Sequence, residues 1–389
     1  MAQGQTADGS VGEGSIGEGS VGEGSIGEGL LAEAAASKES ARPIPAIALS
    51  PVLSARYRGR DLERIREAAP GTRLVMVSRE GIADGPLDDV EVLLRGFISA
   101  DAFDRVLAKA PRLAWVHSAS AGVENVLTPL SRERGVVITN ARGVFSRPIA
   151  EYVLMMILAV SRRLPQLLEL QRERTWQPLE GVELRDVTVG IVGLGSIGRA
   201  VGALATSFGC RVIATRRRAE VGTGIGAAGG DGSGETRADD DELSLGELML
   251  DRVAGPEGLP ALLAESDFVV LALPLTSETE NVIDDEMLRQ MKPGAWLINI
   301  ARGRLVDDRA LLRAVREGRI GGAVLDAFRE EPLPSGSPFY ELPNVIVTPH
   351  TSWSSGRVLD RSIGLFCDNL RRFSRGQTLL NIVDPAAGY

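Results

Sequence analysis

The spacing of three glycines in the middle of the chain constrains its fold more than any other feature. Residues 187–192 form a short apolar run rich in β-branched residues, which predicts a buried strand. Gly193, Gly195 and Gly198 follow with G-x-G-x-x-G spacing, and apolar residues then recur at helical intervals. Residues 211–214 predict a second strand. The pattern therefore indicates a strand–helix–strand unit with the glycines in its first turn.

Each glycine has its own physical reason to stand in that turn. Gly193 permits the tight exit from the strand, Gly195 lets the backbone approach a pyrophosphate, and Gly198 lets the helix pack closely against the strand. The unpaired N–H groups and the positive end of the helix then favour phosphate. We expect a dinucleotide to bind here and to contact Ser196 and Ile197 as well. The alternative is a glycine-rich turn without a ligand.

Composition limits the remaining possibilities. The 389 residues suffice for two domains, and 44% of them are hydrophobic, as a globular core requires. The net charge of -9 argues against nucleic acid or an anionic membrane as a partner, and no apolar run is long enough to span a bilayer. Cys210 and Cys367 stand far apart and do not form a disulfide framework, so we expect a cytoplasmic protein.

Two segments are too polar and glycine-rich to build a core. Residues 1–42 include four copies of the repeat Gly-Ser-(Val/Ile)-Gly-Glu, which predict a disordered acidic tail. Residues 219–255 are dominated by Gly, Asp, Glu and Ser, and we expect a disordered surface insertion there. The acidic run 239–242 has no histidine or cysteine beside it, so no metal site is predicted.

Predicted strands and helices alternate through the rest of the chain. Such alternation indicates an α/β protein with doubly wound parallel sheets, one before and one after the long apolar helix predicted at 146–164. We expect Ser146 to cap this helix and Met155 and Met156 to lie in the core. Six strands are expected in the second sheet, at about residues 187, 211, 268, 296, 322 and 345.

Three polar residues stand just past predicted strand ends: Arg302, Glu331 and His350. Ligands of parallel α/β sheets bind at the carboxyl ends of the strands, so these side chains are candidates for one site. The arginine fork matches a carboxylate, and a histidine exchanges protons near neutral pH. The chain has a second histidine, His117, which we expect to be structural or at the rim of the substrate loop. A neighbouring carboxylate favours the imidazolium, and Glu330 competes with Glu331 for that position.

From about residue 46 onward the chain resembles the D-isomer-specific 2-hydroxyacid dehydrogenase family. The motifs that carry the resemblance are GLGSIG at 193–198, LPLTSET at 273–279, NIARGRLVD at 299–307, LDAFREEP at 325–332 and TPH at 348–350. The resemblance implies a Rossmann cofactor domain at 146–350, inserted into a flavodoxin-like substrate domain formed by 45–145 and 351–389. It also implies a homodimer through the cofactor domain.

The resemblance implies roles for individual residues. Arg302 would bind the substrate carboxylate and polarise the keto oxygen, His350 would donate and accept the proton, and Glu331 would hold the histidine. The backbone of Ala121, Gly122 and Val123 resembles the loop that binds the substrate carboxylate. Further expected cofactor contacts are Pro274, Thr279, Ala301 and Asp326, the last near the nicotinamide.

The implied activity is NAD(P)-dependent hydride transfer between the nicotinamide and a small 2-keto or D-2-hydroxy acid, of the glyoxylate or hydroxypyruvate type. An alternative is a non-catalytic dinucleotide sensor, since the family includes corepressors and Trp353 completes their H-x-x-W arrangement with His350. Trp353 is otherwise a substrate-binding candidate that would restrict substrate size.

The end of the second predicted strand indicates which nicotinamide is used. NAD-specific sites place Asp or Glu there to accept from the ribose 2′-hydroxyl. This chain instead has Thr215, Arg216 and Arg217, which suit a 2′-phosphate. We therefore expect NADP to be preferred and NAD to be used as well.

Overall fold

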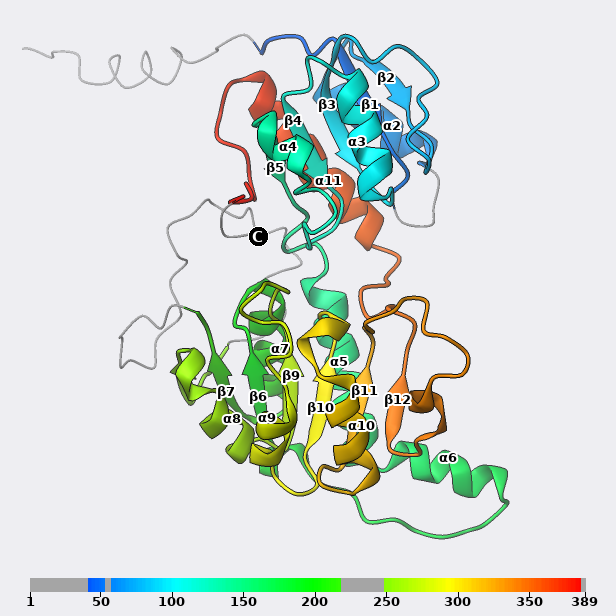
Figure 1. Ribbon diagram of the computed structural model, residues 1–389, viewed down its shortest axis with the longest axis vertical. Coiled ribbons are helices and arrows are strands. Elements are labelled where there is room, and N and C mark those ends of the chain that lie inside the picture. The colour runs from blue at the N-terminus through cyan, green and yellow to red at the C-terminus, as the bar shows by residue number, and fades with distance from the viewer. Residues whose placement is uncertain (1–40, 53–56, 218–247, 386–389) are drawn as a thin grey trace, which may run out of the picture. The chain divides into compact units, whose positions relative to one another are not determined.

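The computed structural model describes residues 41–52, 57–217 and 248–385 (Figure 1). Residues 1–40 of the expected tail and residues 219–247 of the expected insertion lie outside these ranges. The last residue of the expected tail, Arg42, is instead held by the fold: its N–H donates to the Ser374 carbonyl at 2.8 Å and its side chain pairs with Glu91 at 2.6 Å.

The first sheet has five parallel strands in the order β2-β1-β3-β4-β5. This is the flavodoxin-like order that the resemblance implied. Every residue of β1, β3 and β4 is buried, as expected for parallel strands covered on both faces. The strands are β1 (Ala46–Leu49), β2 (Arg73–Met76), β3 (Val90–Arg95), β4 (Trp115–Ser118) and β5 (Val137–Thr139).

The second sheet has seven parallel strands in the order β12-β11-β10-β9-β6-β7-β8. Its first six strands in sequence follow the Rossmann order, and one further strand extends the sheet. The strands are β6 (Thr188–Val192), β7 (Arg211–Thr215), β8 (Arg252–Ala254), β9 (Phe268–Leu271), β10 (Trp296–Asn299), β11 (Gly322–Leu325) and β12 (Val345–Val347).

Strand β8 corrects two expectations. It makes the second sheet seven-stranded instead of six-stranded, and it lies inside the range 219–255 that was expected to be disordered. Asp251 fixes this edge strand: its backbone N–H donates to the Val212 carbonyl at 2.8 Å, and its carboxylate accepts the Val212 N–H at 3.0 Å. A three-residue strand next to a long stretch rich in Gly, Asp, Glu and Ser gives no readable periodicity, so only the pairing with β7 reveals it.

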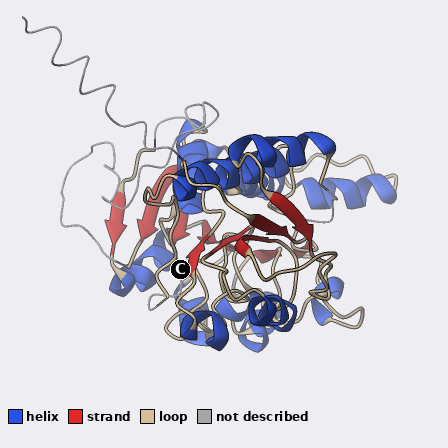
Figure 2. Cartoon of the chain, turned by 90° about the horizontal axis from the view of Figure 1, so that it is seen from above, coloured by secondary structure: helices blue, strands red, loops and turns tan. Residues whose placement is uncertain are grey.

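Helices lie on both sides of the strands (Figure 2). No helix in the described ranges is both long and apolar enough to cross a membrane. The helices are α2 (Gly59–Ala68), α3 (Ala100–Lys109), α4 (Pro129–Glu133), α5 (Ser146–Ser161), α6 (Leu164–Arg172), α7 (Ser196–Ser207), α8 (Leu259–Glu265), α9 (Asp285–Gln290), α10 (Asp308–Arg316) and α11 (Val358–Ser374).

Helix α5 differs from the expected helix in three respects. Ser146 is its first residue and provides no cap, because its buried hydroxyl has no partner within the described residues. Met156 is buried, but Met155 is 52% exposed and does not belong to the core. The helix ends at Ser161, because Arg163 takes a left-handed backbone conformation with φ 57° before α6 begins.

The last helix packs on the first sheet although more than 200 residues separate them in sequence. Phe366 of α11 lies with its ring 5.4 Å from the ring of Trp115 in β4. Asp360 of α11 pairs with Arg58, at the start of α2, at 2.7 Å. These contacts place α11 beside α2 and β4.

Candidate active site

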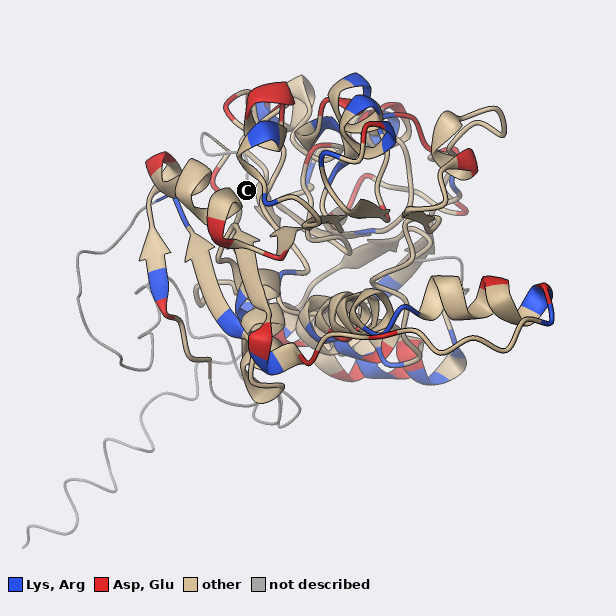
Figure 3. Cartoon of the chain, turned by 90° about the horizontal axis from the view of Figure 1, so that it is seen from below, with Lys and Arg blue, Asp and Glu red and all other residues tan. Residues whose placement is uncertain are grey.

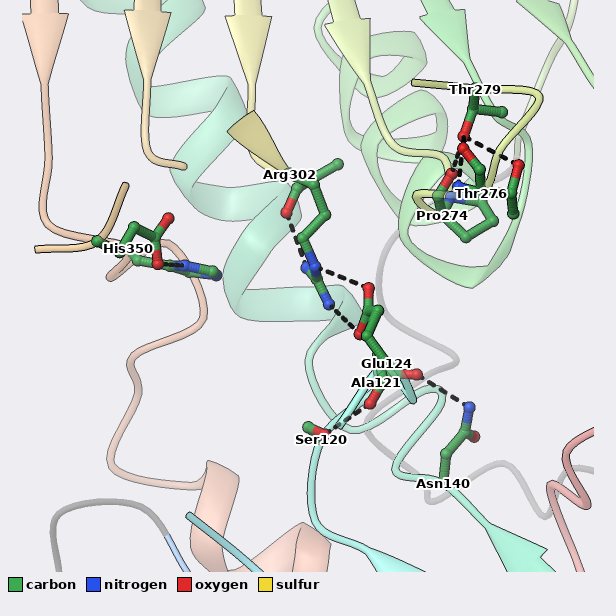
Figure 4. A network of polar contacts seen from close by, with 12 residues as sticks. Ser120, Ala121, Glu124, Asn140, Pro274, Thr276, Thr279, Arg302 and His350 are labelled. Atoms are coloured by element: carbon green, nitrogen blue, oxygen red, sulfur yellow. Dashed lines mark hydrogen bonds and ion pairs between the residues drawn. The ribbon is translucent and has the colours of Figure 1, made fainter. Parts of the chain in front are cut away.

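The carboxyl ends of five strands in the second sheet carry the candidate residues. Gly193 follows β6, Pro274 follows β9, Arg302 follows β10, Glu331 follows β11 and His350 follows β12. Since all strands are parallel, these ends meet at one edge of the sheet. Figure 4 shows Arg302 and His350 just beyond the strands at this edge.

The histidine and the glutamate form a directly paired unit. His350 Nδ1 lies 2.8 Å from Glu331 Oε2, and the Phe328 N–H donates to Glu331 Oε1 at 2.9 Å. Burial opposes ionisation of Glu331, but the hydrogen bonds from His350 and Phe328 and the charges of His350 and Arg302 outweigh it, so the pKa of Glu331 is lowered. The carboxylate therefore stays ionised and fixes Nδ1, which leaves Nε2 as the ring nitrogen able to exchange a proton.

The backbone around His350 is held by Asp326. His350 has a left-handed conformation with φ 49°, which is uncommon for a residue with a side chain. The fully buried carboxylate of Asp326 accepts the N–H groups of Thr351 and Ser352 at 2.8 and 2.9 Å and the Thr348 hydroxyl at 2.6 Å. Asp326 was expected near the nicotinamide. In the structure it anchors the histidine loop, and a contact with the cofactor stays a prediction.

Trp353 supports the same loop. Its indole Nε1–H donates to the His350 carbonyl at 2.7 Å, and its ring packs edge-on against Phe145 at 6.4 Å. The indole therefore contributes to the position of the histidine backbone. Its expected contact with substrate stays a prediction.

The backbone of Arg302 is fixed from β10. The buried side chain of Asn299 donates to the Arg302 carbonyl at 2.9 Å and accepts the Ala301 N–H at 3.1 Å. Gly303 comes next, where a Cβ would lie 2.0 Å from the Phe328 carbonyl carbon. Only glycine allows this approach, so the Arg302 turn packs directly against the turn that leads to Glu331.

The Arg302 side chain reaches the loop between β4 and α4. Its Nε and Nη2 donate to the two oxygens of Glu124 at 3.0 and 3.3 Å, and its Nη1 donates to the Ala301 carbonyl at 2.8 Å (Figure 4). A Cβ on Gly122 would lie 1.9 Å from Arg302 Nη2. The guanidinium is therefore in contact with the loop expected to bind the substrate carboxylate.

That loop presents two backbone N–H groups. Asn140 donates to the Ala121 carbonyl at 3.0 Å, and the Ser120 hydroxyl donates to the Gly122 carbonyl at 2.7 Å (Figure 4). Peptide units are planar and trans, so the N–H groups of Gly122 and Val123 point away from these anchored carbonyls. Within the described residues neither N–H donates to a protein acceptor. Two such donors beside an arginine suit a carboxylate.

The glycine-rich turn fits a dinucleotide pyrophosphate. Gly193 has φ 101°, and a Cβ there would lie 2.7 Å from the Ala272 carbonyl oxygen. A Cβ on Gly198 would lie 2.2 Å from the Gly193 carbonyl oxygen, whereas a Cβ on Gly195 would meet no atom within 4 Å. Gly195 therefore borders open space in front of α7, whose first residues Ser196 and Ile197 present N–H groups without an intrahelical partner.

The basic residues expected to select NADP lie next to this turn. The carbonyl of buried Thr215 accepts the Gly193 N–H at 3.1 Å, which ties the end of β7 to the glycine turn. Arg216 is half-buried, and its N–H donates to the Ala254 carbonyl of β8 at 2.9 Å. Arg217 is exposed.

The remaining cofactor candidates mainly shape the backbone. The Thr279 hydroxyl donates to the Pro274 carbonyl and accepts the Thr276 N–H, both at 2.8 Å (Figure 4). Ala301 is buried and provides the carbonyl that accepts from Arg302. Their contacts with a cofactor stay predictions.

Sequence reasoning missed the residues that position this site: Glu124, Asn140 and Asn299. Asn299 is the first residue of the motif at 299–307, Glu124 directly follows the expected substrate loop 121–123, and Asn140 directly follows β5. Their positions beside strand ends were the available signal, but their partners could not be read from the sequence.

Comparison with known proteins agrees with the geometry. The family model for the NAD-binding domain of D-isomer-specific 2-hydroxyacid dehydrogenases matches residues 154–229 and 247–352. A glyoxylate reductase from Korarchaeum cryptofilum is 32% identical over 330 residues, covering 83% of this chain and 90% of that protein. A glyoxylate reductase from Thermococcus onnurineus is 34% identical over 319 residues, covering 78% and 86%.

Two solved structures are similar over most of the chain. A D-isomer-specific 2-hydroxyacid dehydrogenase from Xanthobacter autotrophicus, in complex with NADPH and MES, has a TM-score of 0.72 and 29% identity over 89% of this chain and 99% of that chain. An NADPH-dependent glyoxylate/hydroxypyruvate reductase from Sinorhizobium meliloti, in complex with NADP and sulfate, has a TM-score of 0.71 and 26% identity with the same coverage. The chain thus belongs to the D-isomer-specific 2-hydroxyacid dehydrogenase family and is an NAD(P)-dependent oxidoreductase.

Proposed function

We propose that this protein reduces a small 2-keto acid of the glyoxylate or hydroxypyruvate type to the D-2-hydroxy acid, and catalyses the reverse oxidation, with His350 as proton donor. The observation that carries the proposal is the His350–Glu331 pair at 2.8 Å, placed at the same strand edge as Arg302. The glyoxylate reductases among its relatives support the substrate class.

Separate groups of the protein transfer the proton and bind the substrate carboxylate. A bound nicotinamide supplies the hydride that the carbonyl carbon accepts. His350 gives the proton from Nε2 to the carbonyl oxygen and becomes neutral, while Glu331 holds Nδ1 and stabilises the imidazolium before transfer. In the oxidative direction neutral His350 takes the hydroxyl proton. Arg302 and the N–H groups of Gly122 and Val123 bind the carboxylate.

The decisive experiment measures turnover and cofactor binding separately. Purified protein is tested against a panel of 2-keto acids with NADPH and NADH, and cofactor dissociation constants are measured by titration. His350→Ala should keep cofactor affinity and lose about 10²–10⁴-fold in turnover. Glu331→Gln should lower kcat, while Glu330→Gln, which changes the exposed neighbouring carboxylate in the same way, should not. Cofactor binding without turnover of any 2-keto acid would favour the corepressor-like sensor.

We also propose that NADP(H) is preferred over NAD(H). Arg216 and Arg217 stand where an NAD-specific enzyme has a carboxylate, and the end of β7 adjoins the glycine turn. One hydrogen bond to a charged group corresponds to roughly a tenfold to hundredfold preference. Arg216→Gln should shift the kcat/KM ratio toward NADH, while Arg211→Gln at the opposite end of the same strand should not. A wild-type protein that favours NADH would contradict this assignment.

We propose a homodimer through the cofactor domain. Helix α6 has no buried residue even though it carries three leucines: Leu164, Leu167 and Leu168 are 39–45% exposed. Nearby Trp176 is fully exposed. Figure 3 shows that α6 is largely uncharged, with charges near its far end. A nine-residue helix is marginal in water unless its apolar side chains are covered, and a second copy of this chain would cover them.

We also propose a cytoplasmic location. The buried free thiols of Cys210 and Cys367 accord with it.

A further inference from the structure

We propose that Glu124 is a positioning residue that aims Arg302 at the substrate carboxylate. The inference rests on the carboxylate-binding role proposed above for Arg302. Glu124 stands 178 residues before Arg302 in the loop after β4, yet it accepts hydrogen bonds from two of the three guanidinium nitrogens. It therefore joins the loop of the first sheet to the site of the second.

The hydrogen bonds of the guanidinium show which edge is left for a ligand. An arginine has five N–H donors in a planar fork. Glu124 accepts hydrogen bonds from Nε–H and from one N–H of Nη2, which lie on the same edge of the guanidinium. The Ala301 carbonyl accepts a hydrogen bond from one N–H of Nη1. One N–H on Nη1 and one on Nη2 remain, and these two point along the end of the fork. That edge can bind a carboxylate in a bidentate manner.

The loop completes the arrangement. Nη2 lies directly against the backbone of Gly122, where even a Cβ would collide with it. The N–H groups of Gly122 and Val123, turned outward by the anchored carbonyls, border the same place. Glu124 lies one residue beyond Val123, so one short loop both holds the arginine and offers the backbone donors.

The value of the Glu124 contact is orientation and not stability. The side chains of Arg302 and Glu124 are 34% and 41% exposed, and ion pairs this exposed stabilise a fold only slightly. A two-point contact nevertheless restricts a long side chain to one direction. Without it, the ligand itself must order Arg302 on binding.

The chain contains a matched control two residues away. Arg304 donates to both oxygens of Glu280 at 2.8–3.1 Å, with side chains 54% and 34% exposed. Glu280→Gln therefore breaks a similar surface pair in the same turn without touching Arg302.

The test measures oxalate binding, by calorimetry, to the full chain saturated with NADPH. Oxalate is a planar carboxylate that mimics a 2-keto acid and is not reduced. We expect its dissociation constant to rise in the order wild type, Glu124→Gln, Glu124→Ala. The alanine variant should be weaker by roughly two- to tenfold, the effect of ordering one freed long side chain. NADPH affinity should be unchanged, and Glu280→Gln should bind oxalate like wild type. In steady state, the KM for a 2-keto acid should rise more than kcat falls.

Three outcomes overturn the inference. Tighter oxalate binding by the Glu124 variants would show that Glu124 competes with the ligand for Arg302. Equal binding by wild type and both variants, or no oxalate binding by wild type, would show that Glu124 does not prepare a carboxylate site. If wild type binds oxalate but reduces no 2-keto acid, the proposed function fails while the order of affinities still decides the role of Glu124.

Discussion

Replacing His117 should reduce the loss of folding stability that this protein undergoes at acidic pH. His117 in β4 is completely buried, with Nδ1 2.8 Å from the Thr139 hydroxyl and Nε2 without a partner among the described residues. The rings of Trp115 and Phe366 surround it at 6.2 and 5.6 Å. Burial lowers the pKa of His117 from 6.5 to about 3, because an imidazolium there would have neither water nor a counter-charge.

The sign and size follow from proton linkage. The unfolded chain binds a proton at His117 below pH 6.5, and the folded chain does not until about pH 3. The stability contributed by the neutral folded form is therefore complete above pH 6.5 and is lost as the pH falls from 6.5 toward 3. Each pH unit in this window corresponds to about 1.4 kcal/mol, so His117 should lower the free energy of unfolding by about 2 kcal/mol at about pH 5.

The assay compares wild type with His117→Asn, whose amide can still reach the Thr139 hydroxyl. Urea unfolding is measured at about pH 7.5 and at about pH 5, with the denaturant slope of each protein checked for constancy. The chain has two histidines, and His350 is common to both proteins, so its contribution cancels. The stability difference between the proteins should shift by about 2 kcal/mol in favour of the variant at the lower pH. A difference that stays the same at both pH values would refute the reasoning.

Three further predictions concern the site and the surface. Asp326→Asn replaces one acceptor oxygen with a donor that faces the loop N–H groups, so kcat should fall by roughly 10–100-fold with NADPH affinity unchanged; weakened NADPH binding would instead support the expected cofactor contact. Gly195→Ala and Gly198→Ala should both weaken NADPH binding in titration, but only Gly198→Ala should lower Tm, because its Cβ would collide with the Gly193 carbonyl. Leu167→Asp on α6 should yield monomers in sedimentation velocity, whereas Gln166→Asp, which adds the same charge at an exposed polar position, should not; a dimeric Leu167 variant would argue against α6 as the interface.

Much of the fold and of the candidate site follows from local patterns. The glycine spacing predicted the turn between β6 and α7, because this spacing is typical of a strand that turns into a helix at a pyrophosphate. In the structure a Cβ on Gly198 would collide with nearby Gly193, whereas a Cβ on Gly193 would collide with distant Ala272. The alternation of apolar strands and helices predicted two parallel sheets, since the period of a pattern identifies an element without its partners. Arg302, Glu331 and His350 could be selected because each follows a recognisable strand, and parallel strands place such ends together.

Tertiary structure decided whatever depends on contacts between distant residues. No local signal distinguishes Met155 from Met156, yet one is exposed and the other is buried, because only the packing of α5 determines which face is covered. Strand β8 exists because β7 offers an unpaired edge to a segment too short to show a period. Glu124 pairs with Arg302 across 178 residues, and Asp326 anchors the loop around His350 across 25 and 26 residues. The sequence by itself determined which groups stand at the strand ends; the folded chain determined what holds each of them in place, because those partners meet only when the sheets and their loops have assembled.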